Sequence, residues 1–258
     1  MLLITCIIQA RRQSERLPDK TLLQLGNRRV LEHVIARCKR IPSVSQVIVA
    51  APEDPFEDAI QDVATGAGAT CFRGDMHDVL SRFYYAAKQA KADYIIRVTA
   101  DCPLLDPGVC QSLVEKLFSE QADYGATASW PHGLDCEVFS WSLLEQAHEQ
   151  AVAKADREHV TLWMKRQKDI NFVSHVPDSG DLYVGNRWVL DYPQDYEFLT
   201  ALFEILPADP DALSWQDILA IIDQHPELRA LNEKCAHDWG KKNEKIYQSV
   251  GHYWKSPS

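Results

Sequence analysis

The stretch LLITCIIQARRQSERLPDK, residues 2–20, decides the fold. Its first nine residues form an apolar run without polar alternation, which is typical of a strand buried on both faces of a sheet. No basic region precedes the run and it is too short to span a bilayer, so we interpret it as neither a signal peptide nor a membrane span. Basic residues follow at once. The first loop of a parallel sheet places them at the edge where ligands bind.

The pattern of a buried strand followed by an amphipathic helix repeats along the first half of the chain. It predicts strands at 46–51, 69–73 and 93–100, and helices at 30–40, 55–64, 77–92 and 108–121. Such alternation indicates an α/β domain whose mostly parallel sheet is covered by helices on both faces.

The alternation loosens near residue 124, where we expect a small antiparallel insertion. The predicted elements are strands at 124–129 and 136–142, helices through 142–167, a strand at 187–191 and a helix at 193–206. The acidic segment 207–214 then leads into a last helix. One α/β domain with an insertion and a helical tail fits this order better than two independent domains.

The first loop carries four cations within ten residues, namely Arg11, Arg12, Arg16 and Lys20. Together with the hydroxyl of Ser14 and free backbone N–H groups, they suit a triphosphate. A solvated basic loop is the alternative, and the position directly after a buried strand favours phosphate binding. No Walker loop and no dinucleotide-binding fingerprint is present, so neither of those classes is indicated.

Two aspartates end predicted strands. Asp101 follows the strand 93–100, and Asp191 ends the strand 187–191. Carboxylates at the edge of a sheet can hold Mg²⁺ against phosphate oxygens, because this ion takes one or two carboxylates plus phosphates and waters. Each aspartate alone is equally well explained as a turn or capping residue. Together with the cationic loop they predict a Mg²⁺ site.

Composition limits the partners. The formal net charge is −10 at pH 7, which argues against a nucleic-acid-binding surface. The seven cysteines are scattered and never spaced as C-x-x-C, so we expect buried thiols in a reducing cytoplasm. We therefore expect a cytoplasmic protein that binds neither nucleic acid nor a membrane.

Taken in order, the motifs resemble a known superfamily. IIQARRQSERLPDKTLLQLGNRRVLEHVI (7–35) resembles the opening of the CMP-sugar synthetase (cytidylyltransferase) superfamily, which includes the 3-deoxy-manno-octulosonate cytidylyltransferases. The later motifs are more similar to its spore-coat polysaccharide biosynthesis branch: FRGDMHDVLSRFYYAAK (72–88), RVTADCPLLDP (97–107), HGLDCEVFS (132–140), DREHVT (156–161) and RWVLDYPQD (187–195). The resemblance covers roughly residues 2–206.

The resemblance implies a GT-A-like, Rossmann-related α/β fold that often forms a homodimer. It divides the chain into a nucleotide-binding domain, 1–206, with an acceptor or dimerisation segment inserted near 124–186, and a helical extension, 207–258. It also implies cytidylyl transfer: CMP passes from CTP to a sugar acid, of the 2-keto-3-deoxy or a related type, and pyrophosphate leaves. The product would be an activated sugar for surface polysaccharide biosynthesis.

The resemblance also assigns roles to individual residues. Arg11, Arg16 and Lys20 are the implied catalytic contacts to the triphosphate, and Asp101 and Asp191 the implied Mg²⁺ ligands. The further nucleotide-binding positions are Ala10, Ser14, Arg73, Ser81, Arg82, Thr99 and Asp101. The implied acceptor-binding positions are Gly133, Leu134, Asp135, Glu137, Arg157, Glu158 and His159.

The opening loop departs from the family pattern. Gln13 and Asp19 stand where glycine is usual, and Glu15 stands where threonine is usual. Glycine lets the backbone approach phosphate and adopt positive φ, and the two acids add negative charge beside a polyanion. These changes leave three outcomes open: weak CTP binding, another path of the loop, or loss of catalysis.

Two rival functions follow. A glycosyltransferase on the same kind of fold would carry a D-x-D motif that holds the metal and diphosphate, and the chain offers only Asp209-Pro-Asp211 in the tail and the pair Asp54 and Asp58. A catalytically silent nucleotide-binding protein is the other rival, because of the altered first loop.

Overall fold

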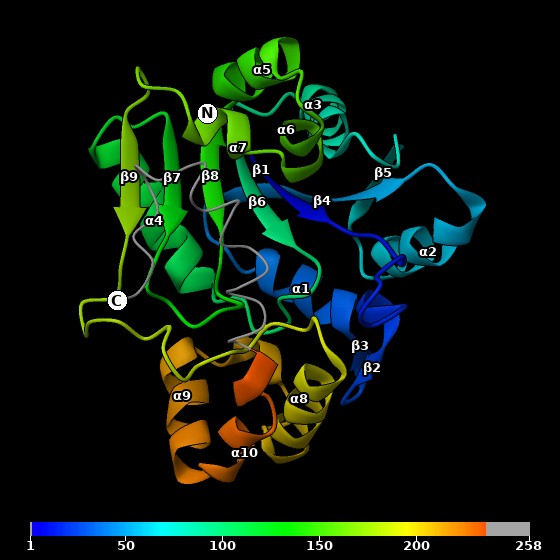
Figure 1. Cartoon of the computed structure of the whole chain (residues 1–258), viewed down its shortest axis with the longest axis vertical. Coiled ribbons are helices and arrows are strands. Elements are labelled where there is room, and N and C mark those ends of the chain that lie inside the picture. The colour runs from blue at the N-terminus through cyan, green and yellow to red at the C-terminus, as the bar shows by residue number, and fades with distance from the viewer. Residues whose placement is uncertain (1, 236–258) are drawn as a thin grey trace.

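Strand β1 (Ile4–Gln9) lies inside a seven-stranded sheet in the computed structural model, which describes residues 2–235. The strand order is β5-β4-β1-β6-β8-β7-β9 (Figure 1). The other strands are β4 (Val44–Pro52), β5 (Thr70–Gly74), β6 (Tyr94–Thr99), β7 (Tyr124–Thr127), β8 (Glu137–Ser140) and β9 (Phe172–His175). β1 pairs in parallel with β4 and β6, which brings the ends of these strands to one edge of the sheet.

One strand runs against the others. β8 pairs antiparallel with both β6 and β7, whereas β7 and β9 pair in parallel. The mostly parallel sheet with a small antiparallel insertion, predicted from the sequence, is therefore confirmed.

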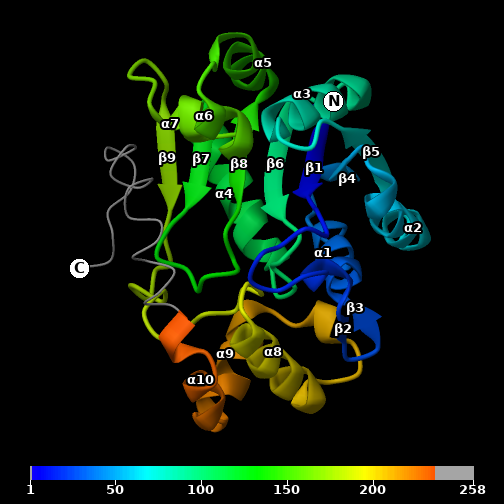
Figure 2. The ribbon, with the colours of Figure 1, turned by 45° about the vertical axis from the view of Figure 1, so that its right-hand side comes forward.

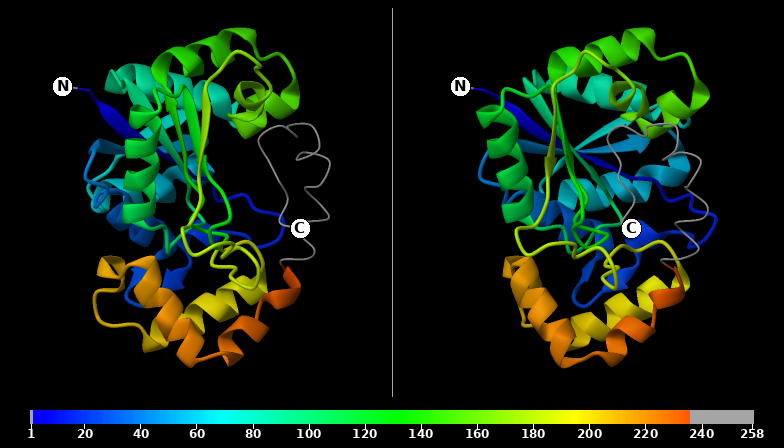
Figure 3. Two further views of the ribbon diagram at one scale, coloured as in Figure 1. Left: turned by 90° about the vertical axis from the view of Figure 1, so that its left-hand side faces the viewer. Right: turned by 60° about the vertical axis from the view of Figure 1, so that its left-hand side comes forward.

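Helices cover both faces of the sheet (Figure 3). Alternate residues of β1 point to opposite sides, as the period of a strand requires. Cys6 and Ile8 pack in the cluster with α1 (Val30–Cys38), α2 (Asp58–Gly66) and α4 (Pro107–Ser119). Ile7 packs in the other cluster, with α3 (Val79–Ala90) and α5 (Trp141–Gln150). The shorter helices α6 (Lys154–His159) and α7 (Leu162–Lys165) follow α5 along the chain.

The last three α-helices of the described residues gather at the carboxyl end of the parallel strands (Figure 1). They are α8 (Pro193–Ile205), α9 (Trp215–Gln224) and α10 (Glu227–Ala230), which share an apolar cluster with Trp188. Asp211, buried in the short helix η3 (Pro210–Ala212), accepts hydrogen bonds from Arg28 and His33 and so fixes this segment to the start of the chain. The part of the extension after residue 235 lies outside the described residues.

The structure differs from the predictions in three places. Residues 187–191 form no strand: only Arg187 makes an isolated bridge, to His132, and the segment is buried because Trp188 and Leu190 pack against α8 and α9. The prediction took a buried extended segment for a strand. β9 and the small antiparallel pair β2 (Gln24–Leu25) and β3 (Arg28–Arg29) were not predicted. Short strands like these carry too few residues to show a period.

No helix within residues 2–235 is long and apolar enough to cross a membrane.

Candidate active site

A pocket of about 1040 Å³ opens at the carboxyl ends of β1 and β6. The loop that leaves β1, drawn in dark blue in Figure 2, forms one wall and ends in the short helix η1 (Lys20–Leu22). Residues from β7, β8, β9, α6 and α7 form the opposite wall. Ligand pockets commonly measure some 300–1,000 Å³, so this space is sufficient for a nucleotide and a second substrate.

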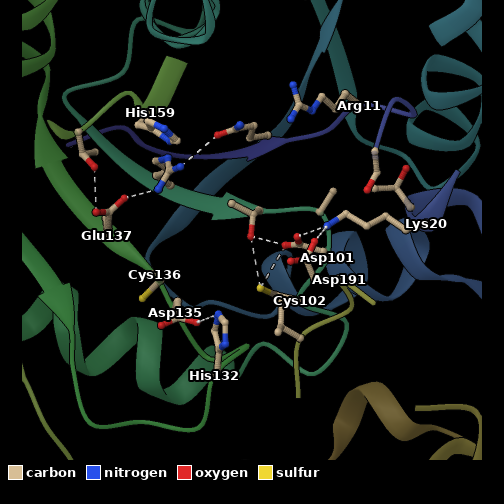
Figure 4. A pocket seen from close by; sticks show the side chains of 18 of the residues that line it. Arg11, Lys20, Asp101, Cys102, His132, Asp135, Cys136, Glu137, His159 and Asp191 are labelled. Atoms are coloured by element: carbon tan, nitrogen blue, oxygen red, sulfur yellow. Dashed lines mark hydrogen bonds and ion pairs between the residues drawn. The ribbon is translucent and has the colours of Figure 1, made fainter. Parts of the chain in front are cut away.

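Lys20 joins Asp101 and Asp191 (Figure 4). Its Nζ lies 2.7 Å from Asp101 Oδ2 and 2.9 Å from Asp191 Oδ1. Burial lowers the pKa of Lys20, but the two carboxylates outweigh this and raise it above its usual value. Burial likewise raises the pKa of Asp101, and the ammonium of Lys20 together with the hydroxyl of Thr99 brings it down to about 2. Lys20 and Asp101 therefore stay charged at neutral pH.

The other two predicted catalytic cations also line the pocket. Arg16 pairs with Asp191 through its guanidinium, and its Nε is buried without a partner. Arg11 projects into the pocket, and its guanidinium makes no hydrogen bond or ion pair within residues 2–235 (Figure 4). Arg11 is thus free to bind an anion, whereas Arg16 and Lys20 neutralise carboxylates.

Arg12 holds the loop in place. Its Nε donates to Asp19 Oδ1 at 2.7 Å and its Nη1 to the carbonyl of Phe56 at 2.6 Å. Its guanidinium also lies 3.9 Å from the centre of the Phe56 ring. Asp19 has φ +58°, the left-handed conformation that glycine would adopt without strain. Gln13 and Glu15 are not among the residues of positive φ within 2–235, so of the three departures only Asp19 occupies a position that favours glycine.

The remaining predicted nucleotide positions divide into two groups. Ser14 and Thr99 line the pocket, and the buried Ala10 follows the last residue of β1. Three others do not line the pocket: Arg73, Ser81 and Arg82. Arg73 turns toward α2 and donates to Asp58 and to backbone carbonyls, and Arg82 is buried beneath β4, donating to the carbonyl of Ala50.

Glu137 is the centre of the second half of the pocket. It accepts hydrogen bonds from Arg97, from Tyr124 and, at 3.0 Å, from Thr161, and it pairs with Lys165 at 2.6 Å. Burial raises the pKa of Glu137, but Lys165 and Arg97 outweigh it and hold this pKa well below its usual range. Glu137 thus has two cations beside it, and Glu158 of α6 is a second carboxylate on the same wall.

The sequence reasoning missed Arg97 and Lys165. Arg97 lines the pocket from β6, and its Nε is buried without a partner. A charged residue inside the apolar strand YIIRVT was the available signal for it. Lys165 ends the four-residue helix LWMK and carries no local signal.

The other predicted acceptor residues are only partly brought together. Asp135, Glu137, Glu158 and His159 line the pocket, whereas Gly133, Leu134 and Arg157 do not. Leu134 is fully buried in the apolar cluster of α8 and α9, and Arg157 pairs with Asp78 on α3's N-terminal side. Burial lowers the pKa of His159, so its imidazole is neutral at pH 7.

The donor set at Asp101 and Asp191 fits Mg²⁺. Their carboxylates share one cation, the Lys20 ammonium, and so face a common point. Within residues 2–235 no group of three or more His, Cys, Asp and Glu side chains is arranged to hold a metal ion. Two carboxylates are the set expected for Mg²⁺ that takes its other ligands from substrate phosphate and water.

Residues 5–211 match the family model described as cytidylyltransferase, which spans the loop, both aspartates and the second half of the pocket. The chain belongs to the cytidylyltransferase family. This cytidylyltransferase is therefore a nucleotidyltransferase enzyme that uses CTP, and the family predicted from its motifs is confirmed.

Individual relatives agree with this assignment. The spore coat polysaccharide biosynthesis protein SpsF of Bacillus subtilis is 28% identical over 236 residues, covering 89% of this chain and 98% of the relative. The 3-deoxy-manno-octulosonate cytidylyltransferase of Escherichia coli is 29% identical over 116 residues, covering 45% of this chain and 46% of the relative. A solved cytidylyltransferase from Leptospira borgpetersenii superposes with a TM-score of 0.83 at 26% identity, covering 88% and 97% of the two chains. The predicted Rossmann-related fold is thus shown.

Proposed function

We propose that this cytidylyltransferase transfers CMP from CTP to a sugar acid, with Mg²⁺ held by Asp101 and Asp191, for surface polysaccharide biosynthesis. The observation that carries the proposal is the arrangement of one pocket: a cationic loop faces two aspartates, and the cations Arg97 and Lys165 lie beyond them. SpsF, a relative over almost its whole length, is named for polysaccharide biosynthesis. A cytoplasmic homodimer remains our expectation from the family resemblance.

The half of the pocket formed by the loop after β1 supplies positive charge that stabilises the leaving group. An acceptor hydroxyl attacks the α-phosphorus of CTP and pyrophosphate leaves, a reaction that depends on positioning and on neutralising charge as it develops. Arg11 is the cation free to contact the triphosphate, and Arg16 and Lys20 border the same space. When bound, Mg²⁺ would supply further positive charge at the phosphate oxygens.

The half of the pocket around Glu137 is suited to bind an acidic sugar as the acceptor. Arg97 and Lys165 both pair with Glu137, and these two cations suit a substrate carboxylate. His159 lines the same half with a neutral imidazole that has no hydrogen-bond partner within residues 2–235. We assign it to accept a hydrogen bond, or the proton, from the acceptor hydroxyl.

The glycosyltransferase alternative is less well supported. Its D-x-D candidate ends at Asp211, which is buried and bonded to Arg28 and His33, outside the pocket. The alternative of a catalytically silent nucleotide-binding protein is also less well supported. Lys20 of the first loop contacts both Asp101 and Asp191, although the loop departs from the family pattern at three positions.

The test incubates the purified protein and Mg²⁺ with each of the four nucleoside triphosphates and a panel of sugar acids, and measures pyrophosphate and the nucleotide-sugar by mass spectrometry. We expect product with CTP and at least one sugar acid, and loss of product in Asp101→Asn. Asp169→Asn, an exposed residue outside the pocket, is the matched control. Pyrophosphate release from none of the combinations would contradict the proposal, as would equal activity of Asp101→Asn and the control.

A further inference from the structure

The backbone around Asp191 is fixed by another aspartate. Asp195 Oδ2 accepts the N–H groups of Asp191 at 3.0 Å and of Tyr192 at 2.9 Å. Asp195 lies in the first turn of α8 and is fully buried. Because Asp191 has no strand on either side of it, these two bonds and the neighbouring bond from Leu190 N–H to the Asp101 carbonyl define its position.

Asp195 is in turn held by an arginine from the same segment. Arg187 donates from Nε to Asp195 Oδ1 and from Nη2 to Oδ2, each at 2.8 Å. Such a bidentate pair fixes orientation as well as distance. Arg187 is itself 5% exposed, so the pair lies in a region of low dielectric where its geometry is strongly held.

A residue of the C-terminal extension completes this network. Asn232 Nδ2 donates to the Arg187 carbonyl at 2.9 Å and to Asp195 Oδ1 at 3.0 Å. Asn232 is 3% exposed and follows α10, so it comes from a part of the chain to which the sequence assigned no role. Its side-chain amide bridges the segment before Asp191 and the helix after it.

We propose that Asn232, Arg187 and Asp195 form a positioning network that fixes Asp191 for metal binding, and that this is a function of the C-terminal extension. The inference rests on the proposed role of Asp191 as a Mg²⁺ ligand. Residues that orient metal ligands contribute to metal affinity even though they do not touch the ion. A network that served only to attach α10 would affect stability without affecting Asp191.

The test compares Asn232→Ala with Leu228→Ala in the full chain. Leu228 is buried in α10 and its side chain belongs to the apolar cluster of α8 and α9 rather than to the hydrogen bonds of the network, so its truncation loosens the packing of the extension. The first readout is amide hydrogen exchange of Asp191 and Tyr192 by NMR, which needs no metal. We expect Asn232→Ala to speed exchange at both amides by about tenfold relative to wild type, and Leu228→Ala to leave it unchanged at a temperature where both are folded.

The second readout is Mn²⁺ affinity, measured by electron paramagnetic resonance with the non-hydrolysable analogue α,β-methylene-CTP. We expect Asn232→Ala to weaken Mn²⁺ binding by roughly tenfold. Unchanged exchange in Asn232→Ala, or an equal effect of Leu228→Ala, overturns the positioning role. If instead Asp191→Asn keeps the Mn²⁺ affinity of wild type, the proposed metal site fails while the exchange result stands by itself.

Discussion

The ammonium of Lys20 lies 2.7 Å from a carboxylate oxygen of Asp101. The same nitrogen lies 2.9 Å from Asp191, so one lysine neutralises two carboxylates that would otherwise repel each other. The site therefore has a built-in cation at the point where the proposed metal ion would bind. If the two carboxylates hold Mg²⁺ as proposed, Lys20 would pair instead with the phosphates of the substrate.

The first prediction concerns Lys20→Met. Loss of a cation that stabilises the leaving group should lower kcat by about a hundredfold, ~3 kcal/mol. Without the ammonium, Asp101 and Asp191 lack their shared partner, so Mg²⁺ should raise the Tm of the variant more than that of wild type. Steady-state kinetics and thermal unfolding with and without Mg²⁺ test this. A smaller Mg²⁺ shift in Lys20→Met would contradict the shared site.

The second prediction concerns the acceptor side. Lys165 lines the pocket next to Glu137, on the wall opposite the phosphate loop. Lys165→Met should raise the KM for the acceptor about tenfold, ~1.4 kcal/mol, and leave the KM for CTP unchanged. Lys168→Met, an exposed lysine outside the pocket, is the control. A rise in the CTP KM alone would assign Lys165 to the nucleotide instead.

How far the sequence predicted these sites depends on the range of the interactions. The cationic loop and Asp101 were placed correctly because a buried strand directly precedes each of them. Asp191 was predicted to lie beside them at the end of a strand that the structure does not contain. A segment buried by helices has the same apolar sequence pattern as a strand buried in a sheet. Lys165 and Asn232 were missed because their partners lie far away in the chain, and single-sequence patterns do not report such contacts.

The third prediction is a pH dependence of stability. The pKa of Glu137 is depressed in the folded protein, so its pairing stabilises the fold above the unfolded-state pKa, near 4.3, and this contribution is lost as the pH falls toward the folded-state pKa. Glu137→Gln leaves Arg97 and Lys165 without their carboxylate and should cost about 3 kcal/mol at pH 7. Urea unfolding at several pH values should show the difference from wild type shrinking below about pH 4. A difference independent of pH would show that the cost is not electrostatic.

The fourth prediction concerns Asp19. Glycine at this position removes the strain of φ +58° and also removes an ion pair with Arg12 that is partly exposed to solvent. The two effects oppose each other, so Asp19→Gly should change the free energy of unfolding by less than about 1 kcal/mol. It should lower the KM for CTP, because a negative charge leaves the pocket wall. Asp62→Asn, exposed and remote, should leave that KM unchanged.

The last prediction concerns Gly133, which was expected in the acceptor pocket and lies behind it. It has φ +116°, and a Cβ there would lie 2.7 Å from the carbonyl carbon of Trp188 and 2.9 Å from the nitrogen of Val189. Those atoms are backbone, so the strand-like segment that ends at Asp191 would have to move. Gly133→Ala should therefore cost about 2–4 kcal/mol of stability and also weaken Mn²⁺ binding.

The matched control for this prediction is Gly180→Ala. Gly180 also has positive φ, +94°, but a Cβ at that position would have no neighbour within 4 Å. Gly180→Ala should therefore lower the free energy of unfolding only by the backbone strain, about 1 kcal/mol, and leave Mn²⁺ binding intact. Urea unfolding and Mn²⁺ titration of the two variants separate the strain that both share from the displacement that only Gly133→Ala produces. Equal losses in the two would mean that the Trp188 backbone adjusts freely, and that Gly133 is needed for its φ angle alone.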